Sequence, residues 1–185
     1  MARISVFCGS SHGKDARIIE DIKTLGLILG QTFHHINYGG GLYGHLKDLM
    51  DSVGKGSAKM SAILSPTYYD AKETYPSFVT VVKALDDEDR VNKLLDADAF
   101  VITPGGDGTL AEAFFSHNRN LSAVYDNKAL KPTVFLDTND FYKNLREHFK
   151  HMADLGYSND KRQEQLHFEK TPQDVIDTII RELKK

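Results

Sequence analysis

Short apolar runs alternate with amphipathic stretches along the whole chain. After the first run, apolar residues at Ile18, Ile22, Leu25 and Leu29 follow helical spacing, and Gly30 ends that stretch. The alternation continues toward the C-terminus, where Thr171 and Pro172 open the last helix. It predicts strands at Ile4–Cys8, His34–Tyr38, Ala58–Ser65, Phe78–Val82, Ala99–Thr103 and Thr133–Leu136, and helices at Asp15–Leu29, Leu42–Val53, Asp87–Asp96, Phe141–Leu155 and Asp174–Leu183.

Strands that alternate with helices form a parallel sheet with helices on both faces. We therefore predict the α/β class: a Rossmann-like, doubly wound parallel sheet in a single nucleotide-binding domain that spans residues 1–185. Such sheets bind ligands at the carboxyl ends of their strands, where the strand order reverses. Three loops follow predicted strands and would lie at this edge: Gly9–Gly13, Tyr38–Gly44 and Pro104–Thr109.

The loop Pro104–Thr109 carries the clearest chemical signal. It follows a buried-type strand and leads into a predicted helix that contains Glu112. Gly105, Gly106 and Gly108 would let the backbone turn sharply and bring its N–H groups close to an anion, and the helix adds the positive end of its dipole. A phosphate cradle beside a carboxylate indicates chemistry on a phosphorylated sugar.

These residues also have ordinary structural interpretations. Thr109 and Glu112 have the spacing of a capping box, in which both side chains satisfy N–H groups at a helix start. Arg90 follows Asp86 by four residues, so an exposed ion pair on one helix face would explain it. Asp86 and the acidic residues after it also suit a helix start, where negative charge meets the dipole.

The other two glycine loops are weaker signals. The spacing Gly39-x-Gly41-x-x-Gly44 matches a dinucleotide fingerprint, but it follows the second strand, and no acidic residue stands where it would hold a ribose. Ser10, in the first loop, offers a hydroxyl either to a ligand or to the start of the next helix.

The composition and net charge of the chain limit the classes of molecule that it is expected to bind. A net charge of −3 and a pI near 6.2 give no basic face for nucleic acid, and no window approaches a membrane span. Cys8 is the only cysteine and suits a buried structural thiol, while His148 and His151 lack a third metal ligand. The N-terminal residues do not match a signal peptide. We expect a small-molecule partner, no nucleic acid, no membrane, no metal and a cytoplasmic location.

Four pieces of the sequence occur in a characteristic order: Phe7-Cys8-Gly9-Ser10-Ser11, Tyr38-Gly39-Gly40-Gly41, Arg90, and Pro104-Gly105-Gly106-x-Gly108-Thr109-x-x-Glu112. Together they resemble the LOG (Lonely Guy) family of cytokinin riboside 5′-monophosphate phosphoribohydrolases, over nearly the whole chain. Members are sometimes labelled lysine decarboxylases, but no pyridoxal-binding arrangement is identifiable here. The resemblance implies hydrolysis of the N-glycosidic bond of adenine-type nucleoside 5′-monophosphates, which releases the base and ribose 5-phosphate without a cofactor.

The resemblance also implies roles for individual residues. Glu112 would be catalytic by stabilising positive charge on the sugar or orienting water, and Arg90 would position Glu112 and contact the ribose or the leaving group. Arg90 cannot serve as a general acid at ordinary pH. The nucleotide and its phosphate would be bound by Ser10, Gly39, Gly40, Gly41, Gly105, Gly106, Gly108 and Thr109. A homodimer is expected on the same ground.

The chain departs from the family at three places. Asp89-Arg90-Val91 replaces the family's His-Glu-Arg-Lys, and a shorter stretch follows before Pro104, which leaves the position of Arg90 open. Asp107 stands where the family has an apolar or aromatic residue, and its carboxylate would repel a phosphate. Gly44-His45-Leu46-Lys47 replaces Gly-Leu-Met-Gly, where Lys47 either adds positive charge to the cleft or is simply solvated.

Two alternatives to the glycosidase therefore remain. One is a catalytically weak nucleotide-binding or regulatory protein that keeps the phosphate cradle. The other is a deoxyribosyl-transfer enzyme in which Glu112 acts as a nucleophile.

Overall fold

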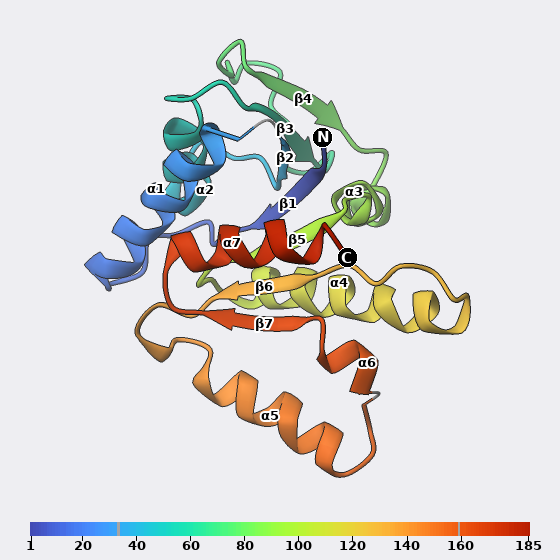
Figure 1. Cartoon of the computed structure of the whole chain (residues 1–185). Coiled ribbons are helices and arrows are strands. Elements are labelled where there is room, and N and C mark those ends of the chain that lie inside the picture. The colour runs from blue at the N-terminus through green and yellow to red at the C-terminus, as the bar shows by residue number, and fades with distance from the viewer. Residues whose placement is uncertain (33, 159) are drawn as a thin grey trace.

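The computed structural model describes residues 1–32, 34–158 and 160–185. Within these residues, seven parallel strands form one sheet in the order β4-β3-β2-β1-β5-β6-β7 (Figure 1). The strands are β1 (Arg3–Phe7), β2 (His35–Tyr38), β3 (Lys59–Leu64), β4 (Val79–Lys83), β5 (Ala99–Ile102), β6 (Thr133–Leu136) and β7 (Leu166–Glu169). This sheet confirms the predicted α/β fold class.

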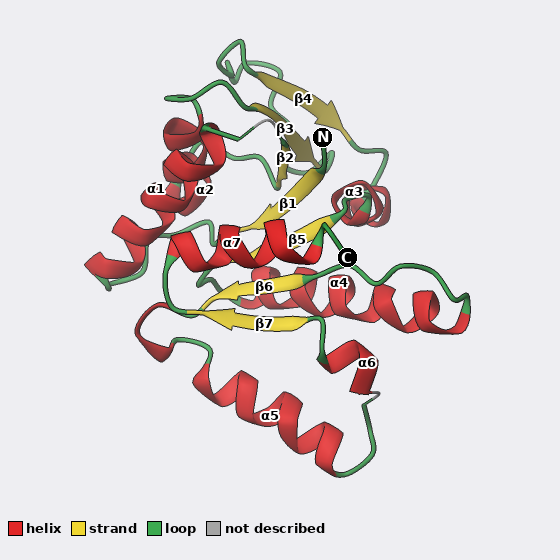
Figure 2. Cartoon of the chain, viewed as in Figure 1, coloured by secondary structure: helices red, strands yellow, loops and turns green. Residues whose placement is uncertain are grey.

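Helices cover both faces of the sheet, as Figure 2 shows. They are α1 (Ala16–Gly30), α2 (Gly44–Val53), α3 (Asp87–Leu95), α4 (Asp107–Tyr125), α5 (Lys143–Asp154), α6 (Asp160–Gln163) and α7 (Pro172–Glu182), with a 3-10 turn, η1 (Thr138–Asp140), before α5. Helices α1, α2 and α7 contribute to one buried cluster, and α3, α4 and α5 contribute to the other. The two clusters are separated by the sheet.

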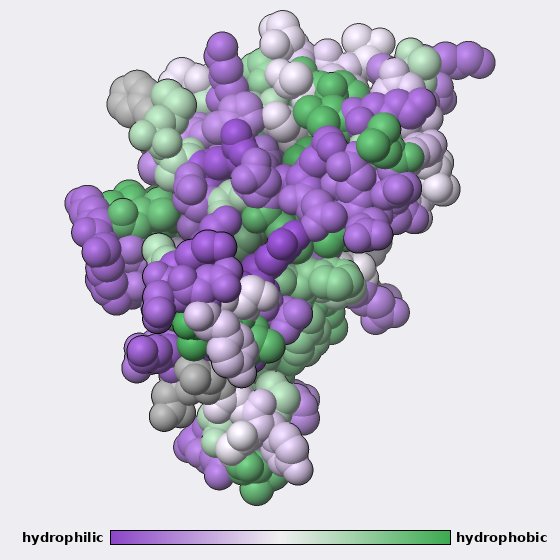
Figure 3. All heavy atoms as spheres, turned by 90° about the vertical axis from the view of Figure 1, so that its right-hand side faces the viewer, coloured by the Kyte–Doolittle hydropathy of each residue, from purple (hydrophilic) through white to green (hydrophobic). Residues whose placement is uncertain are grey.

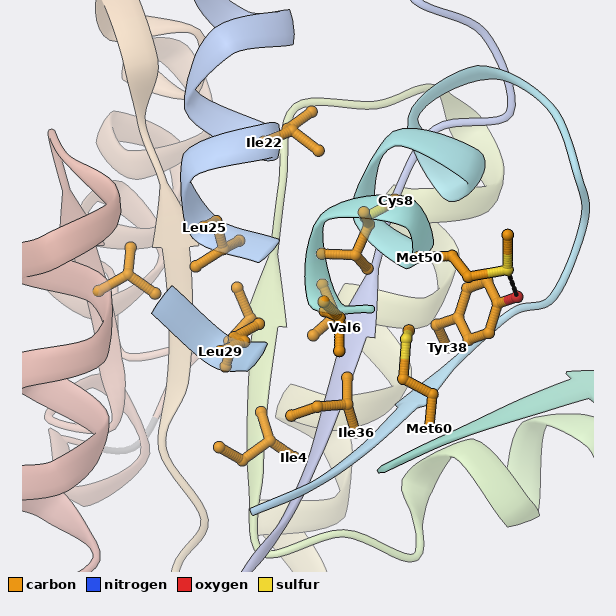
Figure 4. Close-up of a cluster of buried hydrophobic side chains, with 14 of the residues drawn as sticks. Ile4, Val6, Cys8, Ile22, Leu25, Leu29, Ile36, Tyr38, Met50 and Met60 are labelled. Atoms are coloured by element: carbon orange, nitrogen blue, oxygen red, sulfur yellow. Dashed lines mark hydrogen bonds between the residues drawn. The ribbon is translucent and has the colours of Figure 1, made fainter. Parts of the chain in front are cut away.

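Successive side chains of a strand point to opposite faces of the sheet, so one strand can contribute residues to both clusters. In β1, Ile4 and Val6 join the cluster beneath α1 and α2, whereas Phe7 joins the opposite one. Figure 4 shows the first cluster, where the hydroxyl of Tyr38 donates a 3.3 Å hydrogen bond to Met50 Sδ. These positions are almost completely inaccessible to solvent, so the centre of the sheet is a rigid platform for the loops at its edge.

The strand order reverses between β1 and β5. Strands β2, β3 and β4 extend the sheet on one side of β1, and β6 and β7 extend it beyond β5. The loops after β1 and β5 therefore diverge at the carboxyl edge, which is where an open α/β sheet forms its ligand crevice.

The sequence pattern missed β7, η1 and α6. Strand β7 pairs with β6 at the edge of the sheet, and all of its residues are only half-buried, so it has no continuous apolar run. The predicted helix start at Leu42 was also early, because α2 begins at Gly44.

The face that lies toward the right-hand side of Figure 1 is mostly hydrophilic, with smaller apolar groups among the polar ones (Figure 3). Among the described residues, no helix has both the length and the apolar character needed to cross a membrane.

Candidate active site

A cleft of about 580 Å³ opens at the carboxyl edge, where the strand order reverses. All three predicted loops contribute to it. The predicted site residues that line the cleft are Ser10, Gly39, Gly40, Gly41, Arg90, Gly106, Gly108, Thr109 and Glu112. Gly105 is the one predicted site residue outside this lining, and its position faces the side chain of Thr109.

Arg90 and Glu112 form an ion pair in this cleft. Arg90 Nη1 donates to Glu112 Oε1 over 3.0 Å, and both side chains are largely buried. The exposed pair with Asp86 is a wrong interpretation, because Asp86 instead caps α3 by accepting a 2.8 Å hydrogen bond from the N–H of Asp89. The departures around Arg90 therefore leave its side chain in the cleft.

Backbone carbonyls hold the guanidinium group of Arg90 in place. Nε donates to the carbonyl of Ile63 at 3.2 Å, and Nη2 donates to the carbonyl of Gly39 at 3.4 Å. A Cβ atom at position 39 would lie only 2.6 Å from Nη2, so glycine there leaves the space that the guanidinium occupies. The ends of β2 and β3 thus position a side chain that belongs to α3.

Glu112 holds its carboxyl group where water has little access. Its side chain is 15% exposed. Burial raises the pKa of Glu112 above its ordinary value, and the charge of Arg90 and its hydrogen bond oppose that rise. A carboxylate in such a place interacts more strongly with a developing positive charge than it would in water.

Helix α4 directs its N-terminus at the cleft. It begins at Asp107 with Gly106 as N-cap, and no side chain among the described residues caps it. The N–H groups of Asp107, Gly108 and Thr109 are those that a helix start leaves without intrahelical partners. The capping-box interpretation is therefore wrong: Thr109 lies inside the first turn, and Glu112 contacts Arg90 instead.

The glycines of this loop provide space and not unusual backbone angles. Gly105, Gly106 and Gly108 all lack a left-handed φ, so a sharp glycine turn is not what the loop requires. A Cβ at Gly105 would lie 2.3 Å from Thr109 Oγ1, whereas at Gly106 and Gly108 it would meet no atom within 4 Å. The last two positions leave the helix start open to a ligand.

The loop after β2 contains the glycines that need their conformational freedom. Gly40 and Gly41 have φ values of +74° and +88°, which other residues rarely adopt. The N–H of Gly41 donates to the hydroxyl of Tyr75 at 3.3 Å, and that hydroxyl donates to Glu73 Oε2 at 3.3 Å. This loop is therefore braced by a segment that sequence reasoning did not single out.

Sequence reasoning missed three further lining residues, because Tyr43 is a variable position of the second glycine loop and Tyr68 and Glu73 lie in an irregular segment without a motif. Tyr43 and Tyr68 line the cleft, and at least half of the surface of each residue is exposed. Glu73 adds a carboxyl group to the same lining. Asp107 also lines the cleft and is exposed. Aromatic rings offer a surface on which a base can stack.

Two neighbouring residues have structural roles. Lys47 pairs with Asp51 on the exposed side of α2, which favours the solvated interpretation of this lysine. Cys8 is buried, and burial raises the pKa of its thiol to about 12. The expected burial of this thiol is thus confirmed, and a thiolate would not form near neutral pH.

Comparisons with known proteins show similar sequences and a shared fold. The probable cytokinin riboside 5′-monophosphate phosphoribohydrolase LOGL2 of Oryza sativa subsp. japonica is 26% identical over 96% of this chain and 71% of its own length. The cytokinin riboside 5′-monophosphate phosphoribohydrolase LOG7 of Arabidopsis thaliana is 29% identical over 84% of this chain and 70% of its own.

A solved structure titled as the molybdenum cofactor carrier protein from Chlamydomonas reinhardtii shares the fold. Its TM-score is 0.69 at 17% identity, and the match covers 99% of this chain and 98% of that one. The family described as "possible lysine decarboxylase" matches residues 46–179. With that match over most of its length and phosphoribohydrolases as relatives, the chain belongs to the LOG family.

Proposed function

We propose that the protein hydrolyses the N-glycosidic bond of adenine-type nucleoside 5′-monophosphates, including N6-modified forms of the cytokinin riboside type. The observation that carries the proposal is the Arg90–Glu112 ion pair, which lies in one cleft with the open N-terminus of α4. The activity named for the relatives supports the same reaction class.

The proposed mechanism begins with the 5′-phosphate. The N–H groups of Gly108 and Thr109 and the dipole of α4 would bind it, as helix N-termini bind anions. Because the phosphate is remote from the bond that breaks, its binding free energy would hold the ribose in the reactive position beside Glu112.

The sugar would then gain oxocarbenium character as the bond from C1′ to the base breaks. The carboxylate of Glu112 would stabilise this positive charge or orient the attacking water. Water supplies a hydroxyl group to C1′ and a proton to the departing base, so the products are the free base and ribose 5-phosphate. Arg90 would maintain the orientation and ionised form of Glu112.

Base release tests this proposal. Incubation with AMP and isopentenyladenosine monophosphate should give free base and ribose 5-phosphate in equal amounts, and adenosine, which lacks the phosphate, should react poorly. Arg90→Ala and Glu112→Ala should abolish the reaction while circular dichroism stays unchanged. Glu147→Gln is a matched control, because Glu147 is an exposed carboxylate of α5 outside the cleft lining. The proposal fails if no monophosphate is cleaved.

A second candidate is a nucleotide-binding protein without turnover. Asp107 favours it, because an exposed carboxylate in the cleft opposes a phosphate at the start of α4. The likeness to a carrier protein concerns the fold alone, but it supplies a precedent for this architecture in a binding role. Nucleotides would then raise the melting temperature, Gly106→Val would remove that effect, and no base would be released.

A deoxyribosyl transferase would differ from both candidates by a covalent intermediate. A sugar trapped on Glu112 and detected by mass spectrometry would establish that alternative.

The homodimer remains a prediction. Phe115 of α4 is half-exposed and lines a shallow hollow with Val91 and Leu95 of α3, which offers apolar surface for a second copy. Light scattering after size exclusion would give the mass, and Phe115→Lys should yield a monomer if this face mediates the contact.

A further inference from the structure

Three potential metal ligands converge beside the cleft, from parts of the sequence that are far apart. His12 lies in the loop after β1, while His45 and Asp48 lie one turn apart at the start of α2. His12 Nε2 is 2.9 Å from Asp48 Oδ2, and His45 Nδ1 is 3.9 Å from the same oxygen. One ligand atom from each residue lies within 4.8 Å of the other two.

Two atoms at the centre of this cluster are buried, and one of them lacks a hydrogen-bond partner. Within the described part of the chain, His45 Nδ1 has no such partner, and the His45 side chain is only 4% exposed. Asp48 Oδ2 is buried as well, and it lies between His45 Nδ1 and the ring of His12. A buried imidazole nitrogen that faces a carboxylate oxygen is satisfied by a proton or by a cation between the two atoms.

The surroundings are compatible with a cation. Lys23 Nζ approaches the other oxygen of Asp48, Oδ1, at 3.5 Å and leaves Oδ2 available. The His12 side chain is half-exposed, so an ion could enter from solvent and retain a water molecule on that side.

We propose that His12, His45 and Asp48 form a binding site for a divalent transition metal ion, with Zn²⁺ as the best match. Two imidazoles and a carboxylate are ligands that Zn²⁺ prefers, at about 2.0–2.2 Å, so tetrahedral ligand atoms lie roughly 3.3 Å apart. The separations of 2.9 and 3.9 Å bracket that spacing. The bound ion would tie the loop after β1, which carries the cleft residues Ser10 and Ser11, to α2.

Titration calorimetry of untagged, metal-free protein with Zn²⁺ tests the site, and Co²⁺ absorption reports its geometry. We expect one ion per chain, a tetrahedral Co²⁺ spectrum and a higher melting temperature with Zn²⁺. His12→Ala and Asp48→Asn should each weaken binding at least tenfold and abolish the thermal shift. His12 is half-exposed, so its variant should keep the wild-type circular dichroism spectrum.

His151→Ala is the matched control, because His151 is an exposed histidine of α5 outside the cluster. It should bind Zn²⁺ as the wild type does. The proposal is overturned if the wild type binds no Zn²⁺ stoichiometrically, in which case His12 and Asp48 form an ordinary salt bridge, or if His12→Ala and Asp48→Asn bind as tightly as the control. Neither result depends on whether the protein cleaves nucleotides.

Discussion

Replacing Gly39 with alanine should displace Arg90 without unfolding the protein. The added Cβ would lie 2.6 Å from Arg90 Nη2, whereas ordinary contact begins at 3.4 Å, so the guanidinium must retreat by about 0.8 Å. Nη2 is the tip of a flexible side chain, and the other atoms near this Cβ lie 3.8 Å away or more. The clash should therefore be relieved by movement of Arg90 and not of the backbone.

The expected loss is large for such a small change. A misplacement near 1 Å in a catalytic arrangement can lower the rate about 10²-fold, which corresponds to about 2.7 kcal/mol of activation free energy. We expect kcat/KM for base release to fall by that order, while the free energy of unfolding changes by less than about 1 kcal/mol.

A readout that does not require turnover is the carboxyl resonance of Glu112, followed by NMR as a function of pH. Arg90 lowers the pKa of Glu112 against the effect of burial, so moving Arg90 away should raise that pKa further. In an Arg90→Ala background, Gly39→Ala should have no additional effect on either quantity. The reasoning is refuted if Gly39→Ala leaves kcat/KM and the Glu112 pKa unchanged, or if it acts equally without Arg90.

Three further predictions concern charge. Because burial raises the pKa of Glu112, kcat/KM should fall on acidification with an apparent pKa above 4.5; a flat acid limb would contradict its role as a carboxylate. Burial lowers the pKa of His117 from 6.5 to about 4, so the folded state binds its proton less tightly than the unfolded state. The contribution of neutral His117 to the free energy of unfolding should therefore be fully present above pH 6.5 and should fall by up to about 3 kcal/mol as the pH drops toward 4. Urea titrations of His117→Asn should lack this part of the pH dependence. Asp107→Asn should tighten AMP binding up to about fivefold by calorimetry, since it removes about 1 kcal/mol of repulsion across solvent; unchanged affinity would show that Asp107 points away from the phosphate.

The sheet was predictable because its central strands are apolar runs bounded by glycine, proline or polar residues. Strands such as β5 are buried on both faces, so their sequence reports their position directly. β7 was missed because an edge strand of half-buried residues lacks that signal. The capping-box interpretation failed because Thr109 and Glu112 match a local pattern, whereas the helix begins before them, at Asp107.

The candidate site was predictable from motifs only where the motif itself enters the cleft. The glycine-rich loop after β5 predicted a phosphate site by itself. The contact of Arg90 with Glu112 joins residues that are 22 positions apart, and only the family resemblance predicted it. The convergence of His12 with His45 and Asp48 was missed altogether. The spacing of His45 and Asp48, three residues apart on a helix, predicts that two of the ligands share one helix face. The third ligand, His12, depends on how α2 packs beside the loop after β1.

The most direct test of the proposed N-glycosidase is a time course of adenine release from saturating AMP by the wild type and Glu112→Gln, with AMP affinity measured for both. We predict equal amounts of adenine and ribose 5-phosphate from the wild type. Glu112→Gln should bind AMP within a few-fold of the wild type and release base at least about 10²-fold more slowly. Wild-type binding without base release, or an equal rate in Glu112→Gln, would contradict the account.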